Sequence, residues 1–176
     1  VGKEGEETDA RNLVDVIVGV PSSDAAVFLA RYIDITDWKA DRLSRLYEHL
    51  ARFIPSRGLE QVIATARDTR GNDTDFQYVA FKGIQSGIAR RGATESPQIK
   101  SWGINVATKV LEKYPATTKD ASQEVFAKQR FAASLAGKYK IRSLESPLLA
   151  FFEEDKGDVE VKVSALRSLL TLETNK

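Results

Sequence analysis

His49 is the only histidine of the 176-residue chain and its most direct candidate for chemistry, because imidazole can act as a general base near neutral pH. Such a base needs a nucleophile and an orienting carboxylate, and the sequence contains no G-x-S-x-G nucleophile elbow. A metal site is less favoured, since imidazole sites recruit further His or Cys ligands and the chain has no Cys. We therefore expect His49 to lie at the surface or in helix packing and to be dispensable.

Five acidic residues gather near the C-terminus, and their carboxylates could bind Ca²⁺. They lack the alternating pattern of an EF-hand loop, and Lys156 interrupts them. We interpret the segment as a solvated turn whose Asp158 caps the next helix, and we expect neither a metal nor a cofactor. The acidic residues are Glu153, Glu154, Asp155, Asp158 and Glu160.

Tryptophan and arginine side chains contribute most to the binding energy of protein interfaces, so they indicate where a partner could bind. Trp102 falls on an apolar helical face and is expected in the core, whereas Trp38 lies outside the apolar pattern. Two arginines precede Gly92, where they complement the helix dipole or contact an anion or a partner. The candidate partner surface comprises Trp38, Arg42, Arg45, Arg90 and Arg91.

Helix-length amphipathic segments separated by short polar turns must position these residues. The clearest has apolar residues at the i, i+3, i+4, i+7 spacing of a helix, namely Leu43, Leu46, Tyr47, Leu50, Phe53 and Ile54. Cap residues predict helix starts at Asp37, Asp73, Ser96, Asp120, Ser146 and Asp158, and the stretch Pro21-Ser22-Ser23-Asp24 is a further start signal. For the last helix we expect Val159, Val163, Leu166, Leu169 and Leu170 to face inward.

Gly83 and Gly87 lie one turn apart inside a predicted helix, where each glycine costs about 1 kcal/mol relative to alanine. Two glycines inside one helix therefore indicate a packing role, in which the missing side chains allow a neighbouring helix to approach closely. We expect Trp102, on the next helix along the chain, to fill the space that the two glycines leave.

The strongest predicted starts, Asp37, Asp73, Asp120 and Asp158, are separated by 36, 47 and 38 residues, close to the roughly 34 to 47 residues of helical-hairpin repeats. We therefore predict an all-α chain with one α-solenoid domain of HEAT-like hairpins over residues 13–172. Residues 1–12 are expected to be frayed or disordered, and residues 173–176 to form a tail. The alternative architecture is an irregular helical bundle.

Composition narrows the range of partners. Apolar residues make up 42% of the chain, as in a globular protein, and the formal net charge of +1 offers no general attraction for nucleic acid. The sequence contains no run of about 20 apolar residues, so we expect no insertion into a membrane. The absence of an initial Met and the polar final residues lead us to expect a segment of a longer protein.

Four stretches carry a family resemblance. They are VIVGVPSSDAAVFLARYI, LYEHLARFIPSRGLEQVIATARD, FKGIQSGIARRG and IKSWGINVATKVLEKY, which resemble the degenerate HEAT-like repeat region of large bacterial membrane-bound or secreted dehydrogenase-type proteins. The last helix, DVEVKVSALRSLL, is similar to the second helix of a generic HEAT repeat. The resemblance implies a scaffold outside the cytoplasm, between a β-propeller and a haem-binding cytochrome c module, with no chemistry of its own.

These features favour a non-catalytic helical-repeat scaffold or protein-interaction module, whose partner is another protein or a neighbouring domain of the same chain. The oligomeric state stays open. The alternative function is a small-molecule-binding or hydrolytic helical bundle, with a pocket around His49, Tyr47 and nearby carboxylates.

Overall fold

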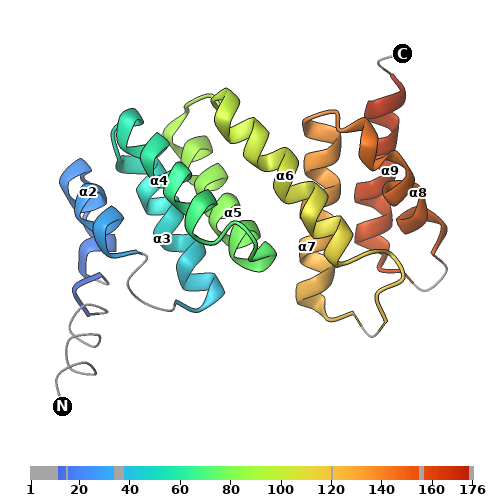
Figure 1. Cartoon of the computed structure of the whole chain (residues 1–176), viewed down its shortest axis with the longest axis horizontal. Coiled ribbons are helices and arrows are strands. Elements are labelled where there is room, and N and C mark those ends of the chain that lie inside the picture. Colours follow the sequence, from blue (N-terminus) through green and yellow to red (C-terminus); the bar gives the residue numbers. More distant parts are fainter. Residues whose placement is uncertain (1–11, 15, 34–37, 120, 155–156, 175–176) are drawn as a thin grey trace. The chain divides into compact units, whose positions relative to one another are not determined.

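The computed structural model describes residues 12–14, 16–33, 38–119, 121–154 and 157–174, and every regular element in these ranges is helical (Figure 1). The predicted all-α class is therefore confirmed. Apart from residue 12, the N-terminus predicted to be frayed lies outside the described residues. Residues 12–14 and 16–18 are helical and precede the labelled helices. The labelled elements are α2 (Ser23–Tyr32), α3 (Ala40–Phe53), α4 (Ser56–Thr69), α5 (Thr74–Arg91), α6 (Pro97–Lys113), α7 (Gln123–Lys138), η1 (Arg142–Leu144), α8 (Glu145–Glu153) and α9 (Val159–Glu173).

The chain divides into two compact units, residues Val1–Gln98 and Ile99–Lys176, whereas the sequence predicted a single domain over residues 13–172. The first unit contains α2 to α5. The second contains α6 from Ile99 onward, α7, η1, α8 and α9.

Side-chain caps set several of the helix starts. Asp73 accepts a hydrogen bond from the backbone N–H of Phe76 at 3.0 Å, and Asp158 accepts one from Val161 at 3.0 Å, so both predicted caps are confirmed. Ser22 caps α2 in the same way. Each oxygen satisfies an amide that has no partner inside its own helix.

Other predicted boundaries differ from the structure. Helix α7 begins at Gln123, and its N-cap is Ser122, whose hydroxyl accepts a hydrogen bond from the Val125 N–H. The helix start predicted at Asp120 is therefore wrong. Helix α3 begins at Ala40 without a side-chain cap. Both Asp37 and Asp120 lie outside the described residues. At the end of α5, Gly92 adopts the left-handed conformation (φ 69°) that a C-terminal glycine cap requires.

In the first unit, α5 packs most closely against α3. A Cβ atom added to Gly83 would lie 2.3 Å from the Ser44 carbonyl oxygen, and one added to Gly87 would lie 2.3 Å from that of Glu48. The predicted close approach at these glycines is therefore confirmed. Its partner was predicted wrongly, because α3 occupies the space assigned to Trp102. Trp102 itself is buried in the second unit, with 1% of its surface exposed.

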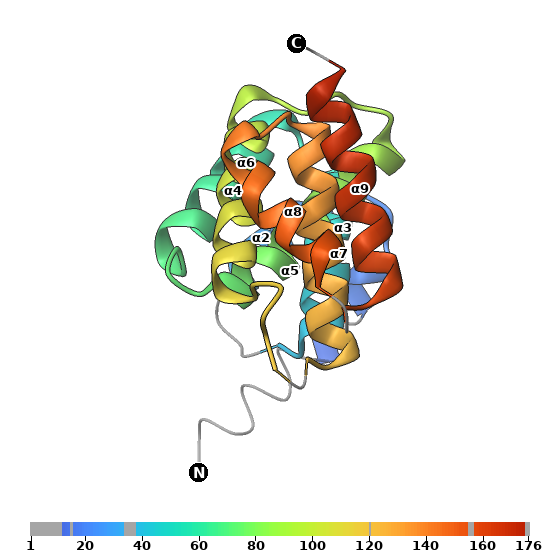
Figure 2. The same cartoon turned by 90° about the vertical axis from the view of Figure 1, so that its right-hand side faces the viewer.

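In the second unit, α9 packs against α7 and against α8. A Cβ atom added to Gly137 of α7 would lie 2.7 Å from the Ser168 hydroxyl oxygen of α9. That hydroxyl donates a 2.7 Å hydrogen bond to the Ala133 carbonyl of α7. Figure 2 shows α8 and α9 side by side. Gly137 thus lets α7 and α9 approach closely, and the buried Ser168 hydroxyl has a backbone acceptor.

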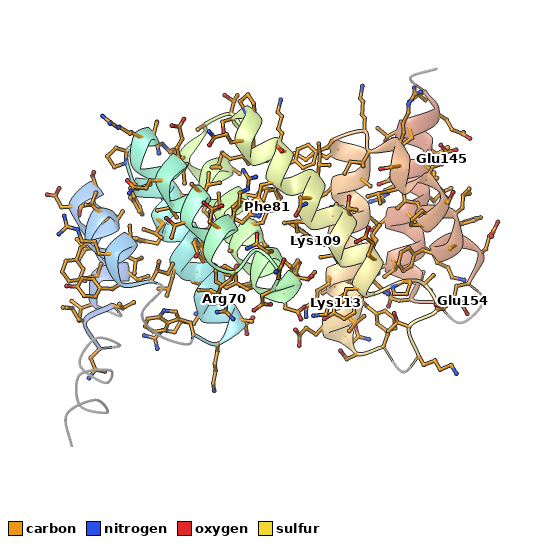
Figure 3. The ribbon with its side chains drawn as sticks, viewed as in Figure 1. Arg70, Phe81, Lys109, Lys113, Glu145 and Glu154 are labelled. Atoms are coloured by element: carbon orange, nitrogen blue, oxygen red, sulfur yellow. The ribbon has the colours of Figure 1, made fainter. Side chains whose placement is uncertain are left out.

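A buried glutamine secures the end of one helix in each unit. Gln77 of α5 donates to the carbonyls of Ala66 and Arg70 at 2.7 and 3.0 Å, at the end of α4. Gln129 of α7 donates to the carbonyls of Tyr114 and Pro115 at 3.2 and 3.3 Å, just beyond α6. In both cases a side-chain amide donates to carbonyls at or just beyond the end of the preceding helix, where helical donors run out. Arg70, labelled in Figure 3, also forms a 2.7 Å ion pair with the capping residue Asp73.

The Gly87→Ala variant tests the α3–α5 contact. Helix propensity alone predicts stabilisation by about 1 kcal/mol. The packing predicts the opposite sign, a loss of about 1 to 3 kcal/mol, because the new methyl group meets the α3 backbone. The free energy of unfolding in urea decides between them. Ala89→Leu, a larger change at an exposed position of α5, is the control and should alter stability by less than about 0.5 kcal/mol.

Candidate functional site

Helix α9 carries apolar side chains on two faces. The buried face packs inside the second unit and consists of Val161, Ala165, Ser168 and Leu172, with Leu169 beside it. Four other apolar residues are exposed: Val159 by 73%, Val163 by 41%, Leu166 by 39% and Leu170 by 53%. We call these four residues the α9 stripe.

The α9 stripe and the buried face have the same internal spacing. Each set repeats after four, three and four residues, and the two sets are offset by two positions. Two positions correspond to about 200° around an α-helix, so the stripe lies nearly opposite the buried face. An amphipathic surface helix normally has one apolar face, and a second exposed one indicates an interaction surface. Helix α8, which packs against α9, carries two more exposed apolar side chains, Leu149 and Phe152.

Of the five residues predicted to face inward, only Leu169 is buried, so the prediction is wrong for Val159, Val163, Leu166 and Leu170. The sequence does show that α9 has two series of residues with this spacing, and one helix face cannot contain both. One series must therefore be exposed. Choosing the buried series required knowing that α9 packs through the small residues Ala165 and Ser168, because the more apolar series is the exposed one.

Trp38 and Arg42, from the predicted partner surface, are both half-buried and engaged within the first unit. The Trp38 indole N–H donates to the Ile33 carbonyl at 2.9 Å. The Arg42 guanidinium lies over the Trp38 ring, 4.6 Å from its centroid, where a cation–π attraction holds it. Arg45 is exposed.

The two arginines at the end of α5 connect that helix to α3. Arg90 forms a 3.0 Å ion pair with Glu48, whose carboxylate also accepts a 2.9 Å hydrogen bond from Ser86. Arg91 donates to the Ile54 carbonyl at 2.7 Å and so caps the end of α3. These contacts give Arg90 and Arg91 structural roles at the helix pair that Gly83 and Gly87 bring together.

His49 is buried, with 7% of its surface exposed, and its Nε2 atom has no hydrogen-bond partner. Its ring centroid lies 4.9 Å from that of Phe53, a half-buried member of the apolar helical series identified from the sequence. Burial lowers the pKa of His49 below 6.5, and the neighbouring Arg52 charge lowers it further. The imidazole is therefore a neutral packing group at pH 7, and its burial argues against the predicted dispensability.

Each unit contains a groove. The first, with a cavity volume of about 300 Å³, includes Tyr47 in a largely apolar lining and has neither His49 nor a carboxylate among its lining residues. The structure therefore does not bring Tyr47 and His49 together there. The second, of about 600 Å³, is lined by Phe126, Phe151 and Glu154 among others; Glu154 is labelled in Figure 3. Within the described ranges, no three His, Cys, Asp or Glu residues are grouped so that they could hold a metal ion.

Comparisons with protein-family models, curated protein sequences and solved structures found no match for this chain. The likeness to HEAT-like regions of dehydrogenase-type proteins therefore stays a prediction. None of the helices in the described part of the chain is both long enough and apolar enough to cross a membrane.

The burial of His49 predicts a pH-dependent stability. Because its pKa is lower in the folded chain, the unfolded chain binds more protons as the pH falls through 6.5, and protonation favours unfolding. The contribution of His49 is complete above that pH and is lost as the pH falls toward the folded-state pKa. The free energy of unfolding, measured between about pH 7.5 and about pH 5, should fall less steeply for His49→Gln than for the parent. Equal slopes would show that His49 is not buried as a neutral ring.

Proposed function

We propose that this chain is a non-catalytic helical scaffold that docks another protein, or a neighbouring domain, on the α9 stripe. The exposure of Val159, Val163, Leu166 and Leu170 on a helix that is already anchored on its opposite face carries the proposal. Apolar surface gains about 25 cal/mol for each Å² removed from water, so a partner that covers the stripe is stabilised there. Scattered exposed apolar residues would mean little, but an aligned set on one helix forms a continuous surface.

Features within each unit support the finer part of the proposal, a HEAT-like arrangement of helical hairpins. Next-but-one helices pack closely, α3 with α5 and α7 with α9, as in a solenoid where equivalent helices of successive hairpins stack. The glutamines Gln77 and Gln129 each secure the end of the preceding helix. A bacterial parent protein of the dehydrogenase type and a location outside the cytoplasm rest on the sequence resemblance alone.

The alternative, a ligand-binding or hydrolytic bundle centred on His49, gains no such support. The ring is buried, its pKa is lowered, and neither of the two grooves described has it among the lining residues. Tyr47, the other residue of that hypothesis, lines the groove of the first unit without a carboxylate beside it.

A selection experiment tests the docking function. A phage-displayed library of amphipathic helical peptides is selected on the immobilised parent chain, and the recovered peptides are titrated against Leu166→Glu and Ile104→Glu. We expect Leu166→Glu to weaken binding at least about tenfold, because a peptide covering the stripe would have to bury a carboxylate. Ile104→Glu is the matched control, since Ile104 is also exposed, by 38%, and lies on α6.

Circular dichroism should show that both variants keep the helical content of the parent, because both positions are exposed. Peptides that bind the two variants and the parent equally would contradict docking on the α9 stripe. A failure to recover any binding peptide would contradict it too.

A further inference from the structure

We infer that the partner of the α9 stripe is a second copy of this chain, whose own α9 packs on it in antiparallel orientation. The inference rests on the proposed function, because both use the same surface. It goes further by naming the occupant and its direction.

The spacing of the α9 stripe is that of a two-helix seam. Intervals of four, three and four residues are those of positions d, a, d and a in a coiled-coil heptad. An antiparallel twofold pairing sets Val163 of one copy against Leu166 of the other, and Val159 against Leu170. Every layer of that seam then combines one smaller valine with one larger leucine, so the pairing is self-complementary and evenly filled.

The charges beside the stripe select the antiparallel direction. Glu160 and Arg167 occupy the two e positions, on the same edge of the stripe, and both are exposed. Antiparallel helices bring equivalent edges together, so Glu160 of each copy lies beside Arg167 of the other, twice in the dimer. Parallel helices would instead place Lys162, at a g position, beside Arg167 of the other copy, and two cations would repel each other.

A contact within the second unit positions Glu160 at this edge of the stripe. Arg130 of α7 pairs with the carboxylate of Glu160 and holds it on the α9 surface. The Glu160 side chain remains 73% exposed in that ion pair, so it is still accessible to an arginine of a second copy.

The size of the surface sets the expected strength. Helix α9 has 15 residues and is thus about 22 Å long. A single helix seam of that length falls short of the roughly 800 Å² per partner that a standard stable interface buries. Exposed Leu149 and Phe152 on α8 offer further apolar area beside α9. We therefore expect reversible association with a Kd on the order of 10 μM to 1 mM.

Cysteine cross-linking tests the direction, and the chain provides no background because it has no cysteine. Val159→Cys and Leu170→Cys are prepared separately, one of them isotopically labelled, and are oxidised alone and as a mixture. In the antiparallel seam, like positions lie roughly 16 Å apart, beyond the reach of a disulfide, whereas positions 159 and 170 of different copies face each other.

We expect disulfide-linked dimers in the mixture, composed of one chain of each kind, and little cross-linking in either variant alone. Cross-linking of each variant with itself would indicate parallel pairing and overturn the inference. An absence of cross-linking in the mixture would overturn it as well.

Sedimentation velocity over a concentration series supplies the second test. The weight-average mass of the parent should rise with concentration, while Leu166→Glu should stay monomeric and the control Ile104→Glu should behave like the parent. Arg167→Glu should weaken association at least about fivefold, since it places a carboxylate beside that of Glu160 in the other copy.

The outcomes separate this inference from the proposed function. A parent that stays monomeric, but binds helical peptides in a manner sensitive to Leu166→Glu, refutes the second copy and leaves a different protein as the partner of the stripe. A parent that neither associates nor binds such peptides refutes both.

Discussion

The contact between Gly137 and Ser168 fixes the rotation of α9, and the exposure of its stripe depends on that rotation. The Ser168 hydroxyl lies where a side chain at position 137 would have to be, and it donates to the Ala133 carbonyl. Rotating α9 to bury its more apolar face would break this hydrogen bond, whose net contribution to stability is about 1 kcal/mol, and would set a larger side chain against Gly137. The series with the smaller side chains is therefore buried, and the larger valines and leucines face solvent.

Close packing at glycine residues also determines how helices α3 and α5 of the first unit pack. Gly83 and Gly87 allow the α3 and α5 backbones to approach, and Arg90 and Arg91 then reach acceptors at Glu48 and at the end of α3. Because the two backbones are close, Arg90 and Arg91 of α5 can bind groups of α3 and at its end. In the first unit, polar contacts around the glycine contact add to an apolar core, whereas the second unit leaves the α9 stripe exposed.

The sequence predicted the features that depend on local chemistry. Helical periodicity indicated the all-α class, and the caps at Asp73 and Asp158 follow from hydrogen bonding within a few residues of the chain. It also predicted that the glycines of α5 mark a close contact. It failed where the answer depends on which distant element approaches. The partner of Gly87 is α3 rather than the helix with Trp102, and the buried face of α9 is the less apolar of two faces with equal spacing.

Methyl NMR in dilute solution, with a soluble paramagnetic agent, tests most directly whether α9 has this rotation. The account predicts that the agent strongly attenuates the methyl signals of Val163, Leu166 and Leu170, and leaves those of Val161 and Leu172 nearly unchanged. The first three are exposed by 41%, 39% and 53%, whereas the last two are exposed by only 2% and 5%. Equal attenuation of both sets, or stronger attenuation of Val161 and Leu172, would contradict the account, because the α9 stripe would then not be the surface that this helix presents.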